Sequence, residues 1–338
     1  MLKPDGMPID CSFSENDWHV LAGFWFPVGF SSEVTGSRPV RGRLLDVPLV
    51  LFRTEAGVSV APDYCPHRGT KLSLGRIEGQ EIVCKYHGLS FDGAGRCTRI
   101  PSAPGMAAPA RLDLTTYPAV ERYGLVWTCL KGEGKFPIPD WPELTDPAWQ
   151  RIKMGATWKI GAGRHTENFC DTAHFSFAHA GTFGWPERPD VAPYVVEARP
   201  HGLHYQLLTP QQDGSLFLGK PSYADLLSEY DVYLPYTTRL ILHFPRGDEH
   251  IFDIVAPVSA RESRIFMLKA RDHDLDQPVD EWIAFQEAVN EEDREMVESQ
   301  VPFDLPLDPT AEGHLPADRF SIAYRKALRA LGLKGGAN

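Results

Sequence analysis

Two short segments that each pair a cysteine with a histidine constrain this sequence more than any other feature. The first is Cys65-Pro-His67, and the second, after sixteen intervening residues, is Cys84-Lys-Tyr-His87. With six cysteines and twelve histidines in 338 residues, the pattern is expected by chance at a frequency on the order of 10⁻⁴. Thiolates and imidazoles are metal ligands, so we expect the fold to bring both segments to one metal centre.

The donor set suits a [2Fe–2S] cluster, in which two cysteines hold one iron and two neutral histidines hold the other. Gly69 and Gly88 follow the two pairs and allow the backbone to turn tightly there. One alternative is tetrahedral Zn²⁺, which also accepts two cysteines and two histidines. A zinc finger would place these ligands on a short hairpin and a helix, whereas both segments here lie in a β-rich region. A second alternative is that no metal is bound and that the segments contain two buried cysteines and two unrelated histidines.

The chain is expected to form two domains of α+β class, a β domain over residues 1–135 and a second domain with strands and helices over 136–338. A proline-rich connector, residues 136–142, separates them. Residues 43–129 show the alternation and turn residues typical of strands. Strands are expected at 47–52, 58–61, 82–83, 89–91, 121–127 and 240–244, and helices near 166–179, 280–300 and 316–332.

A second metal site is indicated by His174 and His179. Glu167, Asp171 and His174 are spaced i, i+4 and i+7, so one helix would carry them on one face. Five residues correspond to about 140° of rotation on a helix, so the two histidines can share a metal only if the chain bends between them. Two imidazoles and a carboxylate form the facial triad of non-haem Fe(II) oxygenases, which leaves positions open for O2.

The carboxylate of that triad has to come from another segment. The predicted helix over 280–300 has a buried stripe with one gap, and Asp293 occupies the gap. A carboxylate on a buried face is costly unless it is paired or bound to metal. A solvated acidic face accounts for Glu291, Glu292 and Glu295 but accounts poorly for Asp293. The spacing alone therefore does not decide whether Asp293 is a metal ligand or part of the solvated face. The residues expected to form the buried stripe of this helix are Trp282, Phe285, Val289, Met296 and Gln300.

The two cysteine–histidine segments, extended to Gly69 and Gly88, closely resemble the cluster loops of Rieske non-haem iron oxygenases. Lys85 and Leu89 depart from that pattern, because proline and tryptophan are common at these two positions. Residues 292–300 are similar to the corresponding stretch of N-demethylating members. The resemblance implies a Rieske domain followed by a helix-grip catalytic domain. It also implies two ligand sets, Cys65, His67, Cys84 and His87 for the [2Fe–2S] cluster, and His174, His179 and Asp293 for the mononuclear Fe(II).

The resemblance also implies roles for two neighbouring residues. Asp171 matches an aspartate that connects the metal-site histidine, here His174, to a cluster histidine, here His87, of the next subunit. That connection carries electrons between subunits and requires a ring, expected to be a homotrimer. Asn168 matches a position near the iron.

The implied activity is O2-dependent monooxygenation, either demethylation or hydroxylation, of a small aromatic or heterocyclic compound. Electrons would come from an NAD(P)H-dependent reductase that carries a ferredoxin-type domain. Three alternatives remain open. The first is a ring cis-dihydroxylating dioxygenase of an aromatic acid, and the second is a pure electron-transfer Rieske protein, for which residues 167–179 would be superfluous. The third is a zinc-stabilised binding module.

The net charge and the length of the apolar stretches indicate which classes of binding partner are expected. A net charge of −11 disfavours nucleic acid. Between Asp63 and Arg99 the charge is +2, which either marks the docking site of an acidic partner or reflects chance variation on a solvated surface. The longest apolar stretch, residues 20–30, is too short and too interrupted to span a bilayer. We expect a cytoplasmic protein without membrane contact.

Overall fold

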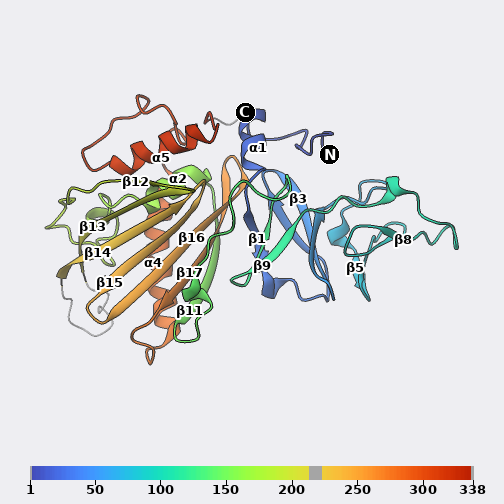
Figure 1. The fold of residues 1–338 in the computed structure, drawn as a ribbon, viewed down its shortest axis with the longest axis horizontal. Coiled ribbons are helices and arrows are strands. Elements are labelled where there is room, and N and C mark those ends of the chain that lie inside the picture. Colours follow the sequence, from blue (N-terminus) through green and yellow to red (C-terminus); the bar gives the residue numbers. More distant parts are fainter. Residues whose placement is uncertain (1, 213–222, 336–338) are drawn as a thin grey trace. The chain divides into compact units, whose positions relative to one another are not determined.

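The computed structural model describes residues 2–212 and 223–335. The chain divides into two compact units, Met1–Ile138 and Pro139–Asn338 (Figure 1). The division falls inside the proline-rich connector of residues 136–142.

The N-terminal unit is built from three small antiparallel sheets. One has the order β1 (Phe26–Phe30), β10 (Leu125–Thr128) and β9 (Ala119–Arg122). The next has β2 (Val40–Leu44), β3 (Val47–Thr54) and β4 (Gly57–Pro62). The last has β5 (Arg76–Glu78), β6 (Glu81–Val83), β7 (Ser90–Phe91) and β8 (Cys97–Arg99). Helix α1 (Glu15–Leu21) precedes them, and short 3₁₀ turns cover Ser31–Glu33, Leu72–Leu74 and Ala110–Leu112.

The prediction of one strand over 121–127 is wrong, because a tight turn divides this segment into β9 and β10. Arg122 pairs with Leu125, and the two residues between them, Tyr123 and Gly124, have φ angles of 58° and 73°. Positive φ at both central residues is the geometry of a type I′ hairpin turn. The glycine supplies this conformation without a steric penalty, so β9 folds back on β10.

Within residues 139–212 and 223–335, the C-terminal unit forms one seven-stranded antiparallel sheet and four helices, which confirms the α+β class. The strand order is β11 (Gln150–Trp158), β17 (Glu262–Arg271), β16 (Gly247–Ser259), β15 (Thr237–Phe244), β14 (Tyr223–Tyr233), β13 (Gly202–Gln212) and β12 (Glu197–Arg199). The helices are α2 (Ala162–Phe169), α3 (Phe175–Ala178), α4 (Val279–Glu298) and α5 (Arg319–Ala330), and a 3₁₀ turn covers Pro142–Leu144.

Helix α4 crosses one face of this sheet (Figure 1). Its buried residues are Trp282, Gln286, Val289 and Val297. The expected stripe is therefore wrong at its C-terminal end, where Met296 is 46% exposed and Val297 is fully buried. On a helical wheel Val297 lies about 20° from the buried Gln286, whereas Met296 lies about 80° from it.

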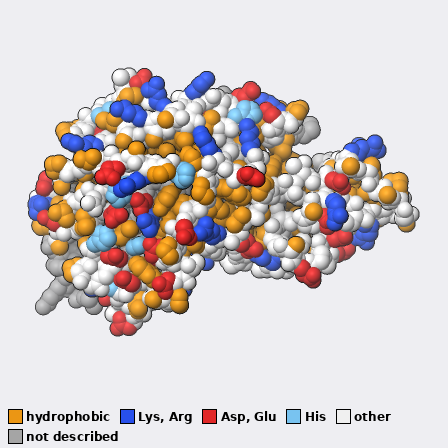
Figure 2. Space-filling model, viewed as in Figure 1, with side chains coloured by type: hydrophobic (Ala, Val, Ile, Leu, Met, Phe, Trp, Pro, Cys, Tyr) orange, Lys and Arg blue, Asp and Glu red, His pale blue; other side chains and the backbone are white. Residues whose placement is uncertain are grey.

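Acidic and basic side chains are interspersed over the face of the molecule shown in Figure 2. None of the helices within residues 2–212 and 223–335 is both long enough and apolar enough to cross a membrane.

Candidate metal centres

The two cysteine–histidine loops have the same backbone hydrogen bonds. The Cys65 N–H donates to the Thr70 carbonyl (2.8 Å), and the Cys84 N–H donates to the Leu89 carbonyl (2.9 Å). The glycine four residues after each cysteine donates its N–H back to the cysteine carbonyl, at 2.8 Å and 3.0 Å. Gly69 and Gly88 have φ angles of 70° and 72°, as their place in the sequence predicts. Each loop is thus closed by its own backbone.

The donor atoms of the two loops converge. Cys65 and Cys84 are 3% and 1% exposed, and the Nδ1 atoms of His67 and His87 are 3.1 Å apart nearer the surface. Burial raises the pKa of the Cys65 thiol to about 11. A thiol in such surroundings becomes a thiolate only beside a cation, and a metal supplies that cation. Two buried sulfurs below two imidazoles therefore fit a [2Fe–2S] cluster.

His174 and His179 are brought together by a break in the helix. Helix α2 ends at Phe169, residues 170–174 are not helical, and α3 runs only from Phe175 to Ala178. The prediction of one continuous helix over 166–179 is therefore wrong. The two histidines flank α3 at either end, and their Nε2 atoms are 3.2 Å apart. The bend that metal sharing requires is present.

Asp293 on α4 completes a group of three possible ligands. Its Oδ1 lies 3.3 Å from Nε2 of His174 and 3.4 Å from Nε2 of His179. One ligand atom from each of the three residues lies within 4.8 Å of the others. Asn168 Nδ2 donates to the same oxygen at 2.9 Å. Two imidazole nitrogens and one carboxylate oxygen therefore face a common point, which fits the facial-triad prediction.

The electrostatics of this group favour a bound cation. Burial acts to raise the pKa of Asp293, but hydrogen bonds from His174 and His179 hold it well below its usual range. Burial likewise acts to lower the pKa of His174, while Asp171 and Asp293 raise it to about 9. The carboxylate thus stays ionised, and a metal ion can take the place of the imidazole proton.

The outward-facing nitrogens of both histidines are held by carboxylates. Asp171 Oδ2 lies 3.3 Å from Nδ1 of His174, and Glu292 Oε2 lies 2.9 Å from Nδ1 of His179. The Thr182 hydroxyl donates to the same Glu292 oxygen at 2.8 Å. Such outer carboxylates fix the ring orientation of a ligating histidine and leave Nε2 for the metal.

Glu292 is a candidate site residue that the helical wheel does not reveal, because the wheel places Glu292 on the solvated acidic face of the helix. The bend before α3 carries His179 to the side of α4 on which Glu292 projects. The available signal was the position of Glu292 directly before Asp293.

Glu167 does not share a face with Asp171 and His174, contrary to the helix prediction. Its two oxygens each lie 2.7 Å from a guanidinium nitrogen of Arg325 on α5. Both residues are buried, and Arg325 also bonds Glu312 at 2.6 Å. This ion pair fastens the C-terminal helix to α2, one residue before Asn168.

A cavity of about 740 Å³ adjoins the three possible ligands. Its wall is formed by the sheet strands β13 to β17, α4 and the segment around α3. The apolar lining includes Phe175, Phe183, Leu226, Leu240, Leu242, Met267, Phe285 and Val289. Half of the lining residues are polar or charged, and the apolar ones supply most of the surface. A cavity with an apolar wall and convergent polar groups is typical of a small-molecule site.

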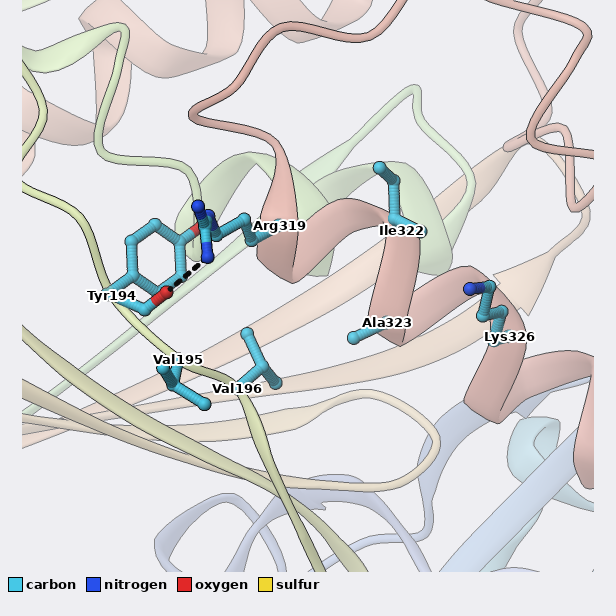
Figure 3. A pocket seen from close by; sticks show the side chains of 7 residues that line it. All are labelled: Tyr194, Val195, Val196, Arg319, Ile322, Ala323 and Lys326. Carbon is cyan, nitrogen blue, oxygen red and sulfur yellow. Dashed lines mark hydrogen bonds between the residues drawn. The ribbon is translucent and has the colours of Figure 1, made fainter.

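A second hollow of about 350 Å³ lies between the segment 194–196 and α5, where the Arg319 side chain donates to the Tyr194 carbonyl (Figure 3). Its lining is Tyr194, Val195, Val196, Arg319, Ile322, Ala323 and Lys326. None of these seven residues is a cysteine, a histidine or a carboxylate, so the metal-binding chemistry belongs to the larger cavity.

Two sequence families match the two units. Residues 24–118 match the Rieske [2Fe-2S] domain, and residues 158–334 match the vanillate O-demethylase oxygenase C-terminal domain. The methylxanthine N1-demethylase NdmA of Pseudomonas putida is 31% identical, over 92% of this chain and 89% of its own. The methylxanthine N3-demethylase NdmB of the same organism is 30% identical, over 93% and 90%.

Solved structures agree with these matches. The structure of Pseudomonas putida CBB5 NdmA with caffeine has a TM-score of 0.83 at 28% identity, over 93% of this chain and 92% of that one. Rieske oxygenases carry a [2Fe–2S] cluster and a mononuclear iron and use O2. The chain belongs to the Rieske non-haem iron oxygenases, as an oxygenase component.

Proposed function

We propose that this enzyme is a monooxygenase that demethylates, or hydroxylates, a small aromatic or heterocyclic compound. The observation that carries the proposal is the convergence of His174, His179 and Asp293 at the wall of a largely apolar cavity. Two relatives matched over about nine-tenths of their own length are N-demethylases. Demethylation is therefore favoured over plain hydroxylation, and ring cis-dihydroxylation is the remaining alternative.

Within this proposal, the mononuclear iron, held by His174, His179 and Asp293, supplies O2 activation at its open positions. The residues of the chain do the rest. The apolar wall excludes water and holds a C–H bond of the substrate near the ligand set. Glu292 and Asp171 hold the two imidazoles in the tautomer that presents Nε2. Asn168 fixes the Asp293 carboxylate through its hydrogen bond.

Electron supply is proposed to pass between subunits. Cys65, His67, Cys84 and His87 hold the cluster, and Asp171 of one subunit connects His174 to His87 of the next. Two properties support this arrangement. The Asp171 side chain is 33% exposed although it contacts His174, and His87 is exposed on its own unit. In a closed ring, proposed as a homotrimer, the surface around Asp171 of every chain would contact the surface around His87 of the next chain.

Rieske oxygenase components work with a separate reductase. We propose that an acidic ferredoxin-type domain of that reductase docks beside the cluster loops. Within the described residues, Arg76, Arg96 and Arg99 already contact carboxylates of their own unit. Arg68, Lys71 and Lys85 are exposed and have no such partner in the described part of the chain. These three cations account for the positive charge of the loops.

The test is turnover with a reductase, NADH and matched N-methyl, O-methyl and unmethylated aromatic compounds. Formaldehyde equal to the O2 consumed supports demethylation, because oxidation of a methyl carbon on N or O gives an unstable product that releases it. A hydroxylated product without formaldehyde supports the hydroxylase. A cis-diol overturns the monooxygenase assignment.

A further inference from the structure

Three charged side chains line the cavity beside the first half of α4, whereas the metal ligand candidate Asp293 lies in its second half. Glu249, Lys269 and Arg271 are 9%, 1% and 7% exposed. The Lys269 ammonium lies 2.6 Å from a Glu249 oxygen and donates to Gln286 Oε1 at 2.8 Å. The Glu249 carboxylate is therefore engaged by Lys269.

Arg271 has no carboxylate of its own. It stands directly opposite Glu249 in the β16–β17 register, yet its Nε donates to Gln150 Oε1 (2.8 Å) and its Nη2 to the Gln277 carbonyl (3.3 Å). Both acceptors are neutral, and no carboxylate lies within 4 Å of it among the described residues. The group of three thus has two positive charges and one negative. A buried charge is costly unless it is paired, so this end of the cavity lacks an anion.

The other carboxylates that line the cavity do not fill this role. Asp274 already forms an ion pair with Arg246, at 2.5 Å. Glu281 is exposed in the first turn of α4, and Asp293 belongs to the metal ligands. Glu249, Asp274 and the exposed Asp276 act on Arg271 through space, but none of these carboxylates forms an ion pair with it.

An unpartnered donor lies beside the same residues. Trp282 is 6% exposed and lines the cavity, and its Nε1–H has no hydrogen-bond partner in the described structure. The Arg271 guanidinium carbon and the Lys269 ammonium lie 4.3 Å and 5.1 Å from the indole ring centre. An indole nitrogen only donates, so the group that is missing here is an acceptor.

We propose that Arg271, Lys269 and the Trp282 Nε1–H bind a carboxylate of the substrate, at the opposite end of the cavity from the metal ligands. A guanidinium and an adjacent N–H match the two oxygens of a carboxylate. This inference rests on the proposed function, because it takes the cavity to be the substrate site.

The same geometry sets the length of the substrate. Trp282 and Asp293 are eleven residues apart on α4, which corresponds to about 16 Å along the helix. A simple benzoic acid is too short to reach from one end to the other. The expected substrate is an acid with two fused rings or an extended side chain, oxidised at the end opposite its carboxylate.

Calorimetric titration of the holoenzyme with 6-methoxy-2-naphthoic acid and with its primary amide tests the carboxylate subsite. The acid is expected to bind roughly tenfold or more tightly than the amide, and Arg271→Gln should weaken the acid by roughly ten- to a hundredfold. The affinity for the amide should change by less than about threefold. Trp282→Phe keeps the ring and removes only the N–H, and it should weaken the acid alone by roughly three- to tenfold.

Arg246→Gln is the matched control, because it removes the same charge from the same cavity but from a cation that already has a carboxylate partner. The acid-to-amide ratio should survive this change. An equal loss in Arg246→Gln and Arg271→Gln would reduce the effect to general electrostatics and overturn the subsite. Equal affinities for acid and amide, or no measurable binding of either, would overturn it as well.

Turnover distinguishes this proposal from the proposed function. If the acid binds selectively and Arg271→Gln abolishes the selectivity, but no formaldehyde or hydroxylated product forms from any methylated compound, the subsite stands and the reaction is wrong. If product forms without any preference for acids, the reaction stands and the subsite is wrong.

Discussion

The two candidate metal centres are assembled in opposite ways. All four donors of the cluster site lie within 23 residues, on two loops that close through their own backbone hydrogen bonds. The mononuclear site joins His174 and His179 to Asp293, more than a hundred residues away, and two side-chain carboxylates orient its histidines. The first centre therefore depends on local sequence, whereas the second depends on how α4 lies against the broken segment between α2 and α3. Substitutions at the two centres should therefore differ in their effects on metal content and turnover.

The largest expected effect is on the local centre. Cys65→Ser or Cys84→Ser should abolish the visible absorption of the cluster and lower turnover by more than about a hundredfold, because a cluster that loses one thiolate is not retained. The C-terminal unit should stay folded, which thermal unfolding followed by circular dichroism checks. Cys97→Ser is the matched control, since Cys97 is buried in the same unit outside both loops. A colourless native protein with stoichiometric zinc would instead establish the zinc alternative.

Asp171→Asn tests whether the second centre extends beyond one chain. The amide keeps the size of the side chain and removes the charge that couples two imidazoles. Reductase-dependent reduction of the cluster and iron content should stay near normal, while turnover should fall by about a hundredfold. Stopped-flow absorbance separates the two steps. Turnover close to that of the unaltered enzyme would refute the connection between subunits.

Glu292→Gln tests the same comparison. Glu292 makes the same kind of contact to His179 that Asp171 makes to His174, but the proposed connection between subunits does not involve Glu292. We expect iron affinity to fall about tenfold, within the 10–100-fold range typical of outer carboxylates. Excess Fe(II) should restore much of the activity, which it should not do for Asp171→Asn. Metal analysis after gel filtration measures the difference. Equal behaviour of the two variants would mean that both carboxylates serve only to orient their histidines.

The smallest expected effect concerns docking at the cluster loops. If Arg68, Lys71 and Lys85 steer an acidic partner, raising the salt concentration should slow the reductase-dependent rate by roughly two- to tenfold at subsaturating reductase. Lys71→Glu together with Lys85→Glu should reduce the rate and flatten its salt dependence. A rate that is independent of salt would assign the positive excess to chance.

This difference in assembly also explains what could be predicted from the sequence. The four loop residues and their glycines are readable because each loop is a short pattern with its own geometry. Asp293 could be nominated only as a carboxylate in the gap of a buried stripe, because helical spacing does not reveal which element packs against that face. The break at residues 170–174 and the role of Glu292 depend on tertiary contacts, and so does the partner of Glu167. The hairpin at Tyr123 was missed although Gly124 marked it, because the flanking residues alternate like one strand.

The ion pair between Arg325 and Glu167 bears on how this enzyme can be engineered. Arg325 lies close to the C-terminal end of the chain, yet its buried partner is the neighbour in sequence of Asn168, which holds Asp293. Truncation before residue 325 would leave the buried Glu167 carboxylate with Arg164, 3.9 Å away, as its remaining cation among the described residues, at a cost of up to about 3–5 kcal/mol. A mutant library aimed at substrate scope should therefore keep both residues constant, and a fusion partner should follow α5 rather than replace it.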